Sequence, residues 1–467
     1  MNSGEPLKLQ TYSLIITRRS AEELLVAPRG SGWALPEVAV RPNQRLAEQL
    51  TAGTRGSREL ETYCLFVPGL ASTREAAPET VYAVMESLLQ NGKAPAGTYW
   101  MLSRVALRKG TLESHDRAIV QSSLEEMERY TAEPTAGPFG RPGWIKELFQ
   151  WIQDNIGPLG LRVTGAFKQL NGSPAFSLMR IETSGAAVWF KATGEPNRHE
   201  LPVTRTLARL FPGYVPEVLG VHSSWNGWLS REVPGSTLDQ FAEVSAWERA
   251  ARTLAELEIA SIGKSGELLE SGCKDFRLAR LSEQIHPFLD AMSECMAAQK
   301  KQPPAILMGS ELAFLRETLI EACSALAQLD FPDALGHLDF NPGNILLSPE
   351  SCVFLDWAEA CVANPFVTFG YLREHAGRQH LERAGAVEGI TAAYLEPWQA
   401  FFSSSDLERG MAFSSLVGVF AYAVSGNAWR SREGPRNPAL APYFRGLTRR
   451  MHRDASDIRG RSEPCLR

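Results

Sequence analysis

The segment from Gly336 to Trp357, GHLDFNPGNILLSPESCVFLDW, constrains the fold of the chain more than any other segment. Two short apolar runs, Ile345–Leu347 and Val353–Leu355, have the composition of β-strands, and Ser348–Ser351 between them favours a turn. The spacing therefore predicts a β-hairpin centred near Glu350.

The predicted hairpin brings polar side chains together at its open end. Asn344 and Asp356 lie at equal distances from the centre, so the hairpin pairs them, and Asp339 lies on the loop just before the first strand. Two adjacent oxygen ligands suit a hard cation such as Mg²⁺. A carboxylate beside them suits a base that accepts a proton from a hydroxyl group.

The full pattern, His337-x-Asp339-x-x-x-x-Asn344 followed by Asp356-Trp357, resembles the catalytic loop and metal site of the aminoglycoside phosphotransferase and choline kinase family. The resemblance implies a two-lobed protein-kinase-like fold. It implies that Asp339 is the catalytic base, that Asn344 and Asp356 hold Mg²⁺ on the phosphates of ATP, and that His337 braces the loop.

Residues upstream carry the same resemblance. Gln169–Ser173 with the following Pro-Ala is similar to the family's nucleotide-covering loop, which assigns Ser173 to the nucleotide. Lys191 matches the lysine that contacts the nucleotide phosphates, and Glu200 matches its partner on a helix. Arg231 and Val233 match the hinge whose backbone hydrogen-bonds the adenine. The resemblance covers about residues 150–440.

Three positions depart from the family's pattern. Leu338 stands where glycine is usual, Leu257-Glu258 stands where Leu-His commonly ends the first helix of the C-lobe, and Thr368 stands where an aspartate often supports the catalytic loop. These departures put activity in question more than they question the fold.

The fold class expected is α+β, with a kinase-like region preceded by a separate mixed α/β domain. The boundaries expected are residues 1–135 for the first domain, 136–143 for a linker rich in proline and glycine, and 144–467 for the kinase-like domain. Within the latter, the β-rich N-lobe spans about 144–232 and the helical C-lobe about 236–450.

Hydrophobic patterns locate the individual elements. Strands are expected at residues 12–16, 24–26, 63–67 and 80–85, and helices at 114–130 and 144–156. Three N-lobe strands follow, the first ending near Leu170 with Asn171-Gly172 as a hairpin turn. Beyond about Leu238 the pattern is mainly helical, with one short β segment around 345–356.

The first domain resembles the opening of a Nudix hydrolase fold, in which Trp-x-Leu-Pro precedes a catalytic helix. Here Trp33-Ala34-Leu35-Pro36 is followed by a stretch, residues 45–50, that offers the single carboxylate of Glu48. One carboxylate is too few for a metal site that bridges a diphosphate. We therefore expect a Nudix-like scaffold without hydrolase activity, or an unrelated α/β domain.

Composition excludes several classes of function. The net charge of −5 and the pI near 6.0 provide no basic surface for nucleic acid. The seven scattered cysteines include no C-x-x-C pair, which fits a cytoplasmic protein without disulfides. The uncharged stretch Met411–Trp429 is almost long enough to cross a bilayer, but its serines and glycines favour a buried helix, so no membrane partner is expected.

These observations predict an ATP- and Mg²⁺-dependent kinase that transfers the γ-phosphoryl group to a hydroxyl of a small aminoglycoside-, choline- or sugar-like molecule. One alternative is a catalytically impaired kinase fold that serves as a nucleotide-binding module, and a second is Nudix-type hydrolysis by the first domain. The sequence indicates neither the acceptor nor the oligomeric state.

Overall fold

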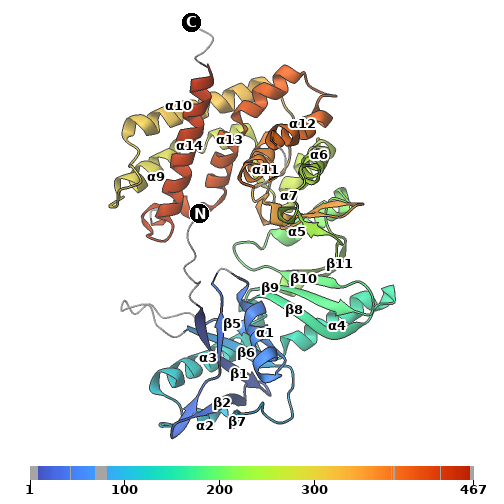
Figure 1. Ribbon diagram of the computed structural model, residues 1–467, viewed down its shortest axis with the longest axis vertical. Coiled ribbons are helices and arrows are strands. Elements are labelled where there is room, and N and C mark those ends of the chain that lie inside the picture. The colour runs from blue at the N-terminus through green and yellow to red at the C-terminus, as the bar shows by residue number, and fades with distance from the viewer. Residues whose placement is uncertain are drawn as a thin grey trace. The chain divides into compact units, whose positions relative to one another are not determined.

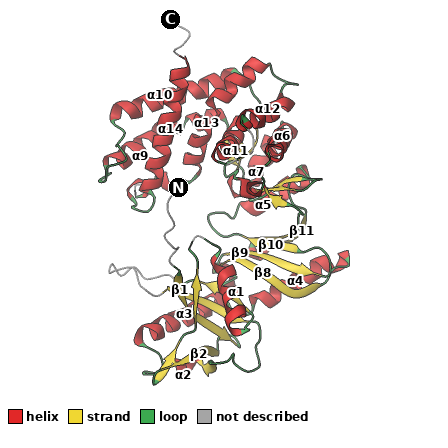
Figure 2. Ribbon diagram, in the orientation of Figure 1, coloured by secondary structure: helices red, strands yellow, loops and turns green. Residues whose placement is uncertain are grey.

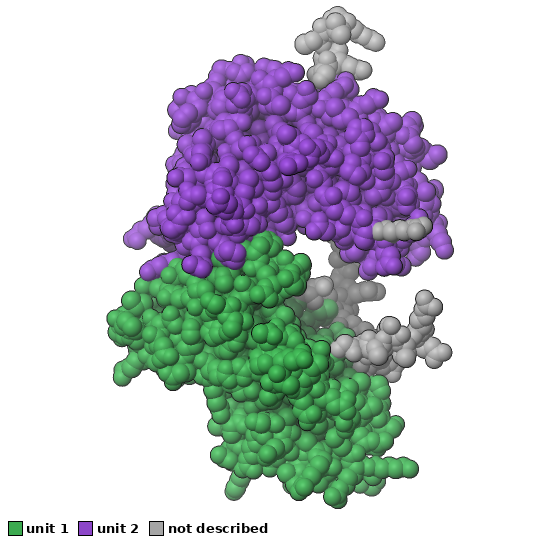
Figure 3. Space-filling view, turned by 180° about the vertical axis from the view of Figure 1, so that it is seen from behind, with its two compact units in different colours: residues 1–201, 218–232 green, residues 202–217, 233–467 purple. Residues whose placement is uncertain are grey.

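The computed structural model describes residues 9–42, 44–68, 81–379, 381, 384–431 and 433–462. The chain forms two compact units (Figure 3). The first contains Met1–Leu201 and Val218–Glu232, and the second contains Pro202–Glu217 and Val233–Arg467. The first unit therefore holds the expected α/β domain together with most of the expected N-lobe.

In the described residues of the first unit, two sheets pack with the helices α1 to α4 (Figures 1 and 2). The N-terminal sheet has the order β3-β2-β1-β6-β5, with β4 beside β1 and β7 beside β2. Its strands are β1 (Gln10–Arg18), β2 (Glu23–Arg29), β3 (Gly32–Ala34), β4 (Glu37–Val40), β5 (Thr62–Phe66), β6 (Val81–Ser87) and β7 (Tyr99–Leu102). The helices are α1 (Leu46–Arg58), α2 (Ser103–Ala106), α3 (Ser114–Ala132) and α4 (Trp144–Ile156).

Helices cover both faces of this sheet. Leu14 and Ile16 of β1 share a core with Leu50 of α1, whereas Ile15 between them shares a core with Val120 of α3. Because successive side chains of a strand point to opposite faces, both sets of positions must be apolar. This explains the unbroken apolar run in β1, which pairs in parallel with β6 and antiparallel with β2 and β4.

The second sheet of the unit is antiparallel and has the order β11-β12-β10-β9-β8. Its strands are β8 (Val163–Ser173), β9 (Phe176–Thr183), β10 (Val188–Ala192), β11 (Val218–His222) and β12 (Gly227–Arg231). It shares one core with the α3 face of the N-terminal sheet, in which Trp144 of α4 is fully buried. The two sheets are therefore joined by packing as well as by the chain.

The segment at 136–143, expected to be a linker, is anchored in this shared core. Phe139 is buried against Trp144, and the backbone N–H of Gly143 donates to Glu86 at 2.7 Å. Glu86 also accepts a hydrogen bond from the Tyr63 hydroxyl group. The proline and glycine content of the segment thus reflects close backbone packing, since a Cβ at Gly137 would lie 2.4 Å from the Tyr130 ring.

The strands and helices expected in this unit are confirmed, with ends shifted by a few residues, although residue 80 lies outside the described part of the chain. One turn is wrong. Asn171 and Gly172 belong to β8, where they pair with Leu178 and Ser177. The turn lies at Pro174-Ala175, because proline fixes φ there and the Ser173 hydroxyl accepts the N–H of Phe176 at 3.1 Å.

The second unit is mainly helical (Figure 2). Helix α5 (Glu200–Leu210) begins at the end of the first unit. The other helices are α6 (Val244–Ala260), α7 (Ser265–Ser271), α8 (Leu278–Ser282), α9 (Ile285–Ala297), α10 (Gly309–Gln328), α11 (Phe366–Arg378), α12 (Ala386–Trp398), α13 (Ser404–Ser425) and α14 (Ala441–Ser462).

Two small sheets lie among these helices, where the sequence predicts one. The expected hairpin belongs to a sheet of β13 (Ser236–Thr237), β16 (Ile345–Leu347) and β17 (Cys352–Phe354). A second sheet joins β14 (Lys274–Phe276), β18 (Ala360–Ala363) and β15 (Ala334–His337). The strands of this second sheet are also short, and they come from three separate places in the chain, so no turn between neighbouring strands marks them as it marks the hairpin.

The uncharged stretch that begins at Met411 lies mostly in α13. Leu416, Val417 and Phe420 of this helix are buried in the core of the second unit, as expected for a core helix. In the part of the chain that the structure describes, no helix is both long and apolar enough to span a bilayer.

Glu258 of α6 is a fully buried carboxyl group. Its Oε2 accepts a hydrogen bond from the Tyr394 hydroxyl of α12 at 2.6 Å, and that hydroxyl also lies 3.1 Å from the carbonyl oxygen of Pro365. Burial raises the pKa of Glu258 well above its usual value. This hydrogen bond joins α6 to α12 at the position where the sequence departs from the Leu-His pattern.

The raised pKa predicts that Glu258 lowers stability as pH rises. Above about pH 4.3, ionisation of this carboxyl group lowers the free energy of the unfolded chain, whereas the folded chain keeps the group protonated. We expect Glu258→Gln, which keeps an acceptor for Tyr394, to raise the free energy of unfolding at pH 7 and to match the wild type near pH 4. Urea denaturation across this pH range measures the difference. If the difference in the free energy of unfolding between the two proteins does not change with pH, Glu258 is not neutral in the folded chain.

Candidate functional site

The loop that carries Asp339 begins at a tightly packed strand end. Gly336 of β15 has no room for a side chain, because a Cβ there would lie 2.8 Å from the Cys361 sulfur and 3.1 Å from the Thr368 hydroxyl oxygen. After Asp339, Asn341 accepts the N–H of Gly343 at 3.0 Å and starts the 3₁₀ turn Pro342–Asn344. An Asn-Pro sequence favours such a turn, and the turn delivers Asn344 to the start of β16.

His337 holds this loop against the second strand of the hairpin. Its Nε2 lies 2.9 Å from the backbone carbonyl oxygen of Leu355, so Nε2 carries the proton and donates it. Burial lowers the pKa of His337 below its usual value. A neutral imidazole in the core suits the bracing role implied by the sequence pattern.

Two of the departures have structural explanations. The Thr368 hydroxyl of α11 accepts the backbone N–H of His337 at 2.9 Å, so a neutral side chain supports the loop at the position of the missing aspartate. Leu338 is buried in the core of the second unit instead of lining the loop's polar side.

The hairpin exists, but its expected register is wrong by one residue. Ile345 pairs with Phe354, and the N–H of Leu355 donates to the carbonyl oxygen of Asn344 at 2.8 Å, so Asn344 lies opposite Leu355. The turn is therefore centred half a residue before Glu350. Asp356 follows immediately and has a positive φ of 63°, a conformation that is costly outside glycine and frequent at functional sites.

The chemistry of Asn344 and Asp356 fits a magnesium ion. The Asn344 side-chain nitrogen donates to the backbone oxygen of Asp339 at 3.0 Å, which leaves the amide oxygen as the group that a cation could use. Magnesium commonly takes one or two protein oxygens and completes its shell with water and phosphate oxygens. Among the described residues no cluster of three or more His, Cys, Asp or Glu side chains is arranged for a metal, so this pair remains the candidate.

Asp339 lies in a polar and partly buried setting. Its Oδ1 accepts a hydrogen bond of 3.3 Å from the Asn341 side chain. Burial raises the pKa of the Asp339 carboxyl, the Asn341 hydrogen bond and His337 oppose this, and the charges of Asp356 and Glu359 add to it. A raised pKa makes this carboxylate a better proton acceptor than an exposed aspartate.

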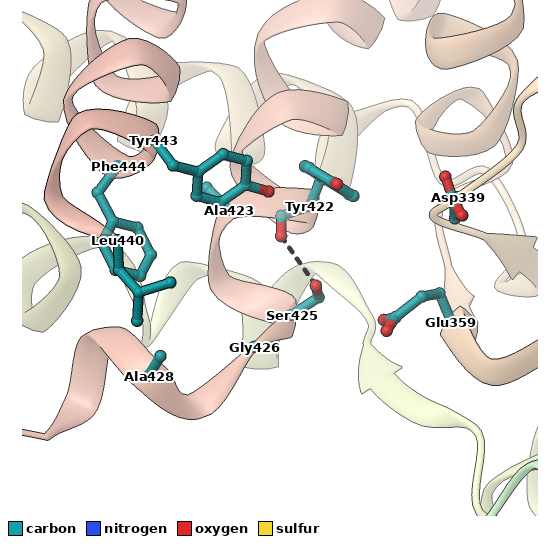
Figure 4. Close-up of a pocket in the computed structure, with 10 residues that line it drawn as sticks. All are labelled: Asp339, Glu359, Tyr422, Ala423, Ser425, Gly426, Ala428, Leu440, Tyr443 and Phe444. Atoms are coloured by element: carbon teal, nitrogen blue, oxygen red, sulfur yellow. Dashed lines mark hydrogen bonds between the residues drawn. The ribbon is translucent and has the colours of Figure 1, made fainter. Parts of the chain in front are cut away.

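Asp339 also lines a cavity of about 290 Å³ in the second unit. Figure 4 shows the carboxyl groups of Asp339 and Glu359 on one side and the rings of Tyr422 and Tyr443 on the other. Lys274 of β14 forms an ion pair with Glu359. The remaining lining residues are small or apolar, namely Ala423, Ser425, Gly426, Ala428, Leu440 and Phe444.

In the first unit, Lys191 and Glu200 come together as the sequence pattern implies. The Lys191 ammonium of β10 forms an ion pair with the Glu200 carboxylate at the start of α5, and Glu200 is almost fully buried. Lys191 also lies 5.7 Å from the centre of the Trp228 ring on the neighbouring strand. The strand and the helix thus fix the position of the ammonium group.

The other residues assigned to the nucleotide occupy turns and strand ends. Ser173 closes the β8–β9 hairpin. Arg231 ends β12 opposite Val188, and Val233 follows at the boundary between the two units. Their roles toward a nucleotide remain predictions.

The sequence interpretation missed several residues around Asp339. The sequence could have indicated Asn341, because an Asn-Pro turn next to the base predicts that the asparagine amide points toward the base. Glu359, Tyr422 and Tyr443 gave no comparable signal, since the cavity depends on how α13 and α14 pack. Among the aromatic residues near the C-terminus, Trp398 and Trp429 are buried, whereas Phe401 is 58% exposed.

Comparison with solved structures finds several kinases and phosphotransferases. A choline/ethanolamine kinase family protein from Mesorhizobium loti is 18% identical with a TM-score of 0.44, covering 63% of this chain and 88% of its own. An ethanolamine kinase from Plasmodium vivax is 15% identical with a TM-score of 0.45, covering 66% and 86%. A macrolide 2'-phosphotransferase from Brachybacterium faecium is 15% identical with a TM-score of 0.41, covering 62% and 98%.

No curated protein matches the chain significantly in sequence. Residues 189–404, however, match the sequence model of the APH phosphotransferase enzyme family. The match begins in β10, just before Lys191, and includes Asp339, Asn344 and Asp356. It begins after the N-terminal sheet, so the likeness of residues 1–135 to a Nudix scaffold stays a prediction. Over residues 189–404, the chain is similar to the phosphotransferase enzyme family.

Proposed function

We propose that this protein transfers the terminal phosphoryl group of Mg·ATP to a hydroxyl group of a small molecule. The observation that carries the proposal is the position of Asp339, whose partly buried carboxylate lines a cavity at the end of β15. The family match over residues 189–404 supports phosphoryl transfer as the reaction class.

In the proposed reaction, Asp339 orients the acceptor hydroxyl and takes its proton. The acceptor oxygen forms a bond to the terminal phosphorus as the bond from phosphorus to the bridging oxygen of ADP breaks. Asn344 and Asp356 would hold a magnesium ion, which would neutralise charge on the phosphates when bound. Lys191, fixed by Glu200, contacts phosphate oxygens, Ser173 covers them, and the backbones of Arg231 and Val233 bind adenine.

The cavity supports a small, hydroxylated acceptor with some positive charge. Two carboxylates face two tyrosine rings across it, and both groups favour cationic parts of a ligand. The pairing of Glu359 with Lys274 reduces the negative charge, so a singly charged or polyhydroxyl molecule fits as well as a polyamine. Aminoglycoside-, choline- and sugar-like acceptors therefore stay within the proposal.

The two alternatives have less support. A catalytically impaired nucleotide-binding module would account for Leu338 and Thr368, but Leu338 packs into the core and Thr368 still supports the loop. A hydrolase in the N-terminal sheet would need Glu48 for a metal, and Glu48 pairs with Lys168 at 2.7 Å instead.

Asp339→Asn tests the base directly. The amide keeps the shape of the side chain but cannot accept a proton, so we expect phosphoryl transfer to fall by about a hundred-fold or more while Mg·ATP still binds. Initial rates with an acceptor that the wild type phosphorylates measure the transfer, and calorimetric titration measures the binding of Mg·ATP. Asp290→Asn, which makes the same change in an exposed acid paired with Arg316 outside the site, serves as the control. Near-normal turnover of Asp339→Asn eliminates this residue as the base.

Asp356→Ala tests the metal assignment. Removing a carboxylate ligand should abolish the magnesium dependence of nucleotide binding, with little change in the melting temperature because the side chain adds little to the core. Nucleotide titrations with and without Mg²⁺ provide the measurement, and Asp275→Ala, which removes an acid paired with Arg277, is a matched control. Unchanged magnesium-dependent affinity shows that Asp356 is not a ligand.

The raised pKa of Asp339 predicts the acid side of the pH–rate profile. Protonation inactivates the base, so kcat/KM falls as pH drops through this pKa, which lies above the value of about 3.9 for an ordinary aspartate. An acceptor without ionisable groups isolates this step. A rate that stays constant down to pH 4 disagrees with a desolvated base, and the residual rate of Asp339→Asn should lack the acid limb.

A further inference from the structure

The turn between β8 and β9, assigned above to the nucleotide, is attached to the N-terminal α/β region at three places. Loops that cover ligands commonly have few buried contacts and move easily. This hairpin differs, because side chains and backbone groups from β5, α1 and residues 137–139 all contact it.

The first attachment is a buried pair of hydrogen bonds. Gln169 of β8 is almost fully buried, and its side chain meets Cys64 of β5 at both ends. The Cys64 N–H donates to the amide oxygen at 2.7 Å, and the Gln169 nitrogen donates to the Cys64 carbonyl oxygen at 2.9 Å. Nearby, a Cβ on Gly172 would lie 3.2 Å from that same carbonyl oxygen, so glycine lets the two strands approach.

The second attachment is at the tip of the turn. The backbone N–H of Phe139 donates to the carbonyl oxygen of Pro174 at 3.0 Å. A Cβ on Gly137 would lie 2.8 Å from the Pro174 side chain, so this segment passes directly against the turn. Because Phe139 is itself buried in the shared core, the tip is held by a rigid neighbour.

The third attachment is a pair of polar contacts on the surface. Glu48 of α1 forms an ion pair with Lys168 at 2.7 Å, and Arg45 donates to the Asn171 side chain at 3.3 Å. Exposed pairs of this kind contribute little energy each. Together with the two buried attachments, they hold the strand on both sides of Gln169.

We propose that the N-terminal α/β region is a positioning element for the nucleotide, which holds the β8–β9 turn in its ligand-binding conformation through Gln169, Pro174 and Lys168. The role toward the nucleotide rests on the proposed function. A loop that is already ordered loses less conformational entropy when ligand binds, so its attachment increases nucleotide affinity. The region then contributes to phosphoryl transfer without chemistry of its own.

Gln169→Leu in the full-length chain tests the buried attachment, because leucine is similar in size but makes neither hydrogen bond. We expect amide hydrogen exchange at residues 168–176 to quicken by roughly ten-fold or more, because two buried hydrogen bonds are lost. The Kd for Mg·ATP should rise by roughly three- to ten-fold. Arg55→Ala on helix α1 breaks an exposed ion pair with Glu61, and this control should change neither value.

A charge swap provides a second test that does not disturb the core. Lys168→Glu places two carboxylates side by side and should speed exchange in the turn by about two-fold, the size expected for an exposed pair. Adding Glu48→Lys to that variant should restore the wild-type exchange rate. If the pair only stabilises the fold, the melting temperature shows the same loss and rescue, but the Kd for Mg·ATP stays unchanged in both variants.

The outcomes separate the inference from the proposed function. Unchanged exchange at residues 168–176 in Gln169→Leu, or faster exchange with an unchanged Kd for Mg·ATP, contradicts the positioning role. A wild-type protein that binds no Mg·ATP contradicts the proposed function and the nucleotide role, while hydrogen exchange still reports whether the turn is held.

Discussion

The hydrogen bond from His337 to the backbone of Leu355 joins the two halves of the candidate site. One half is the loop that carries Asp339, and the other is the strand end that carries Asp356. Because the imidazole is buried and neutral, the bond is shielded from water and fixes the spacing of the two carboxylates. Thr368 holds the backbone of the same residue from the other side, so the loop depends on neutral groups where the family's pattern often has an aspartate.

The sequence predicted the hairpin around the candidate site better than it predicted the surrounding helical architecture. Asp339, Asn344 and Asp356 lie in one short segment whose turn residues and apolar runs dictate a hairpin, so local rules were enough. The register was wrong by one residue because equal spacing about Glu350 ignores how Ser348 and Ser351 close the turn through their backbone at 3.0 Å. Glu359 and the tyrosines of the cavity could not be found in this way, because packing of separate helices brings them to Asp339.

The first 140 residues show the same limit of local reasoning. The strands and helices were predicted by their apolar patterns, and the Pro- and Gly-rich segment at 136–143 suggested two independent domains. Composition could not reveal that Phe139 packs into a core shared by both sheets, or that Gln169 bonds to Cys64 across more than a hundred residues. The roles of Gln169 and Gly172 can be recognised only when the neighbouring strand β5 is known, because both residues lie against Cys64 of that strand.

The central claim is that the chain moves a phosphoryl group from ATP to a hydroxyl, and ³¹P NMR of the reaction tests it most directly. The account predicts that ATP is consumed in the presence of Mg²⁺ only when a hydroxylated acceptor is added, with equal amounts of ADP and a new phosphomonoester. Release of inorganic phosphate at a rate that no acceptor changes, or no consumption of ATP with any of a broad panel of hydroxylated acceptors, would contradict it.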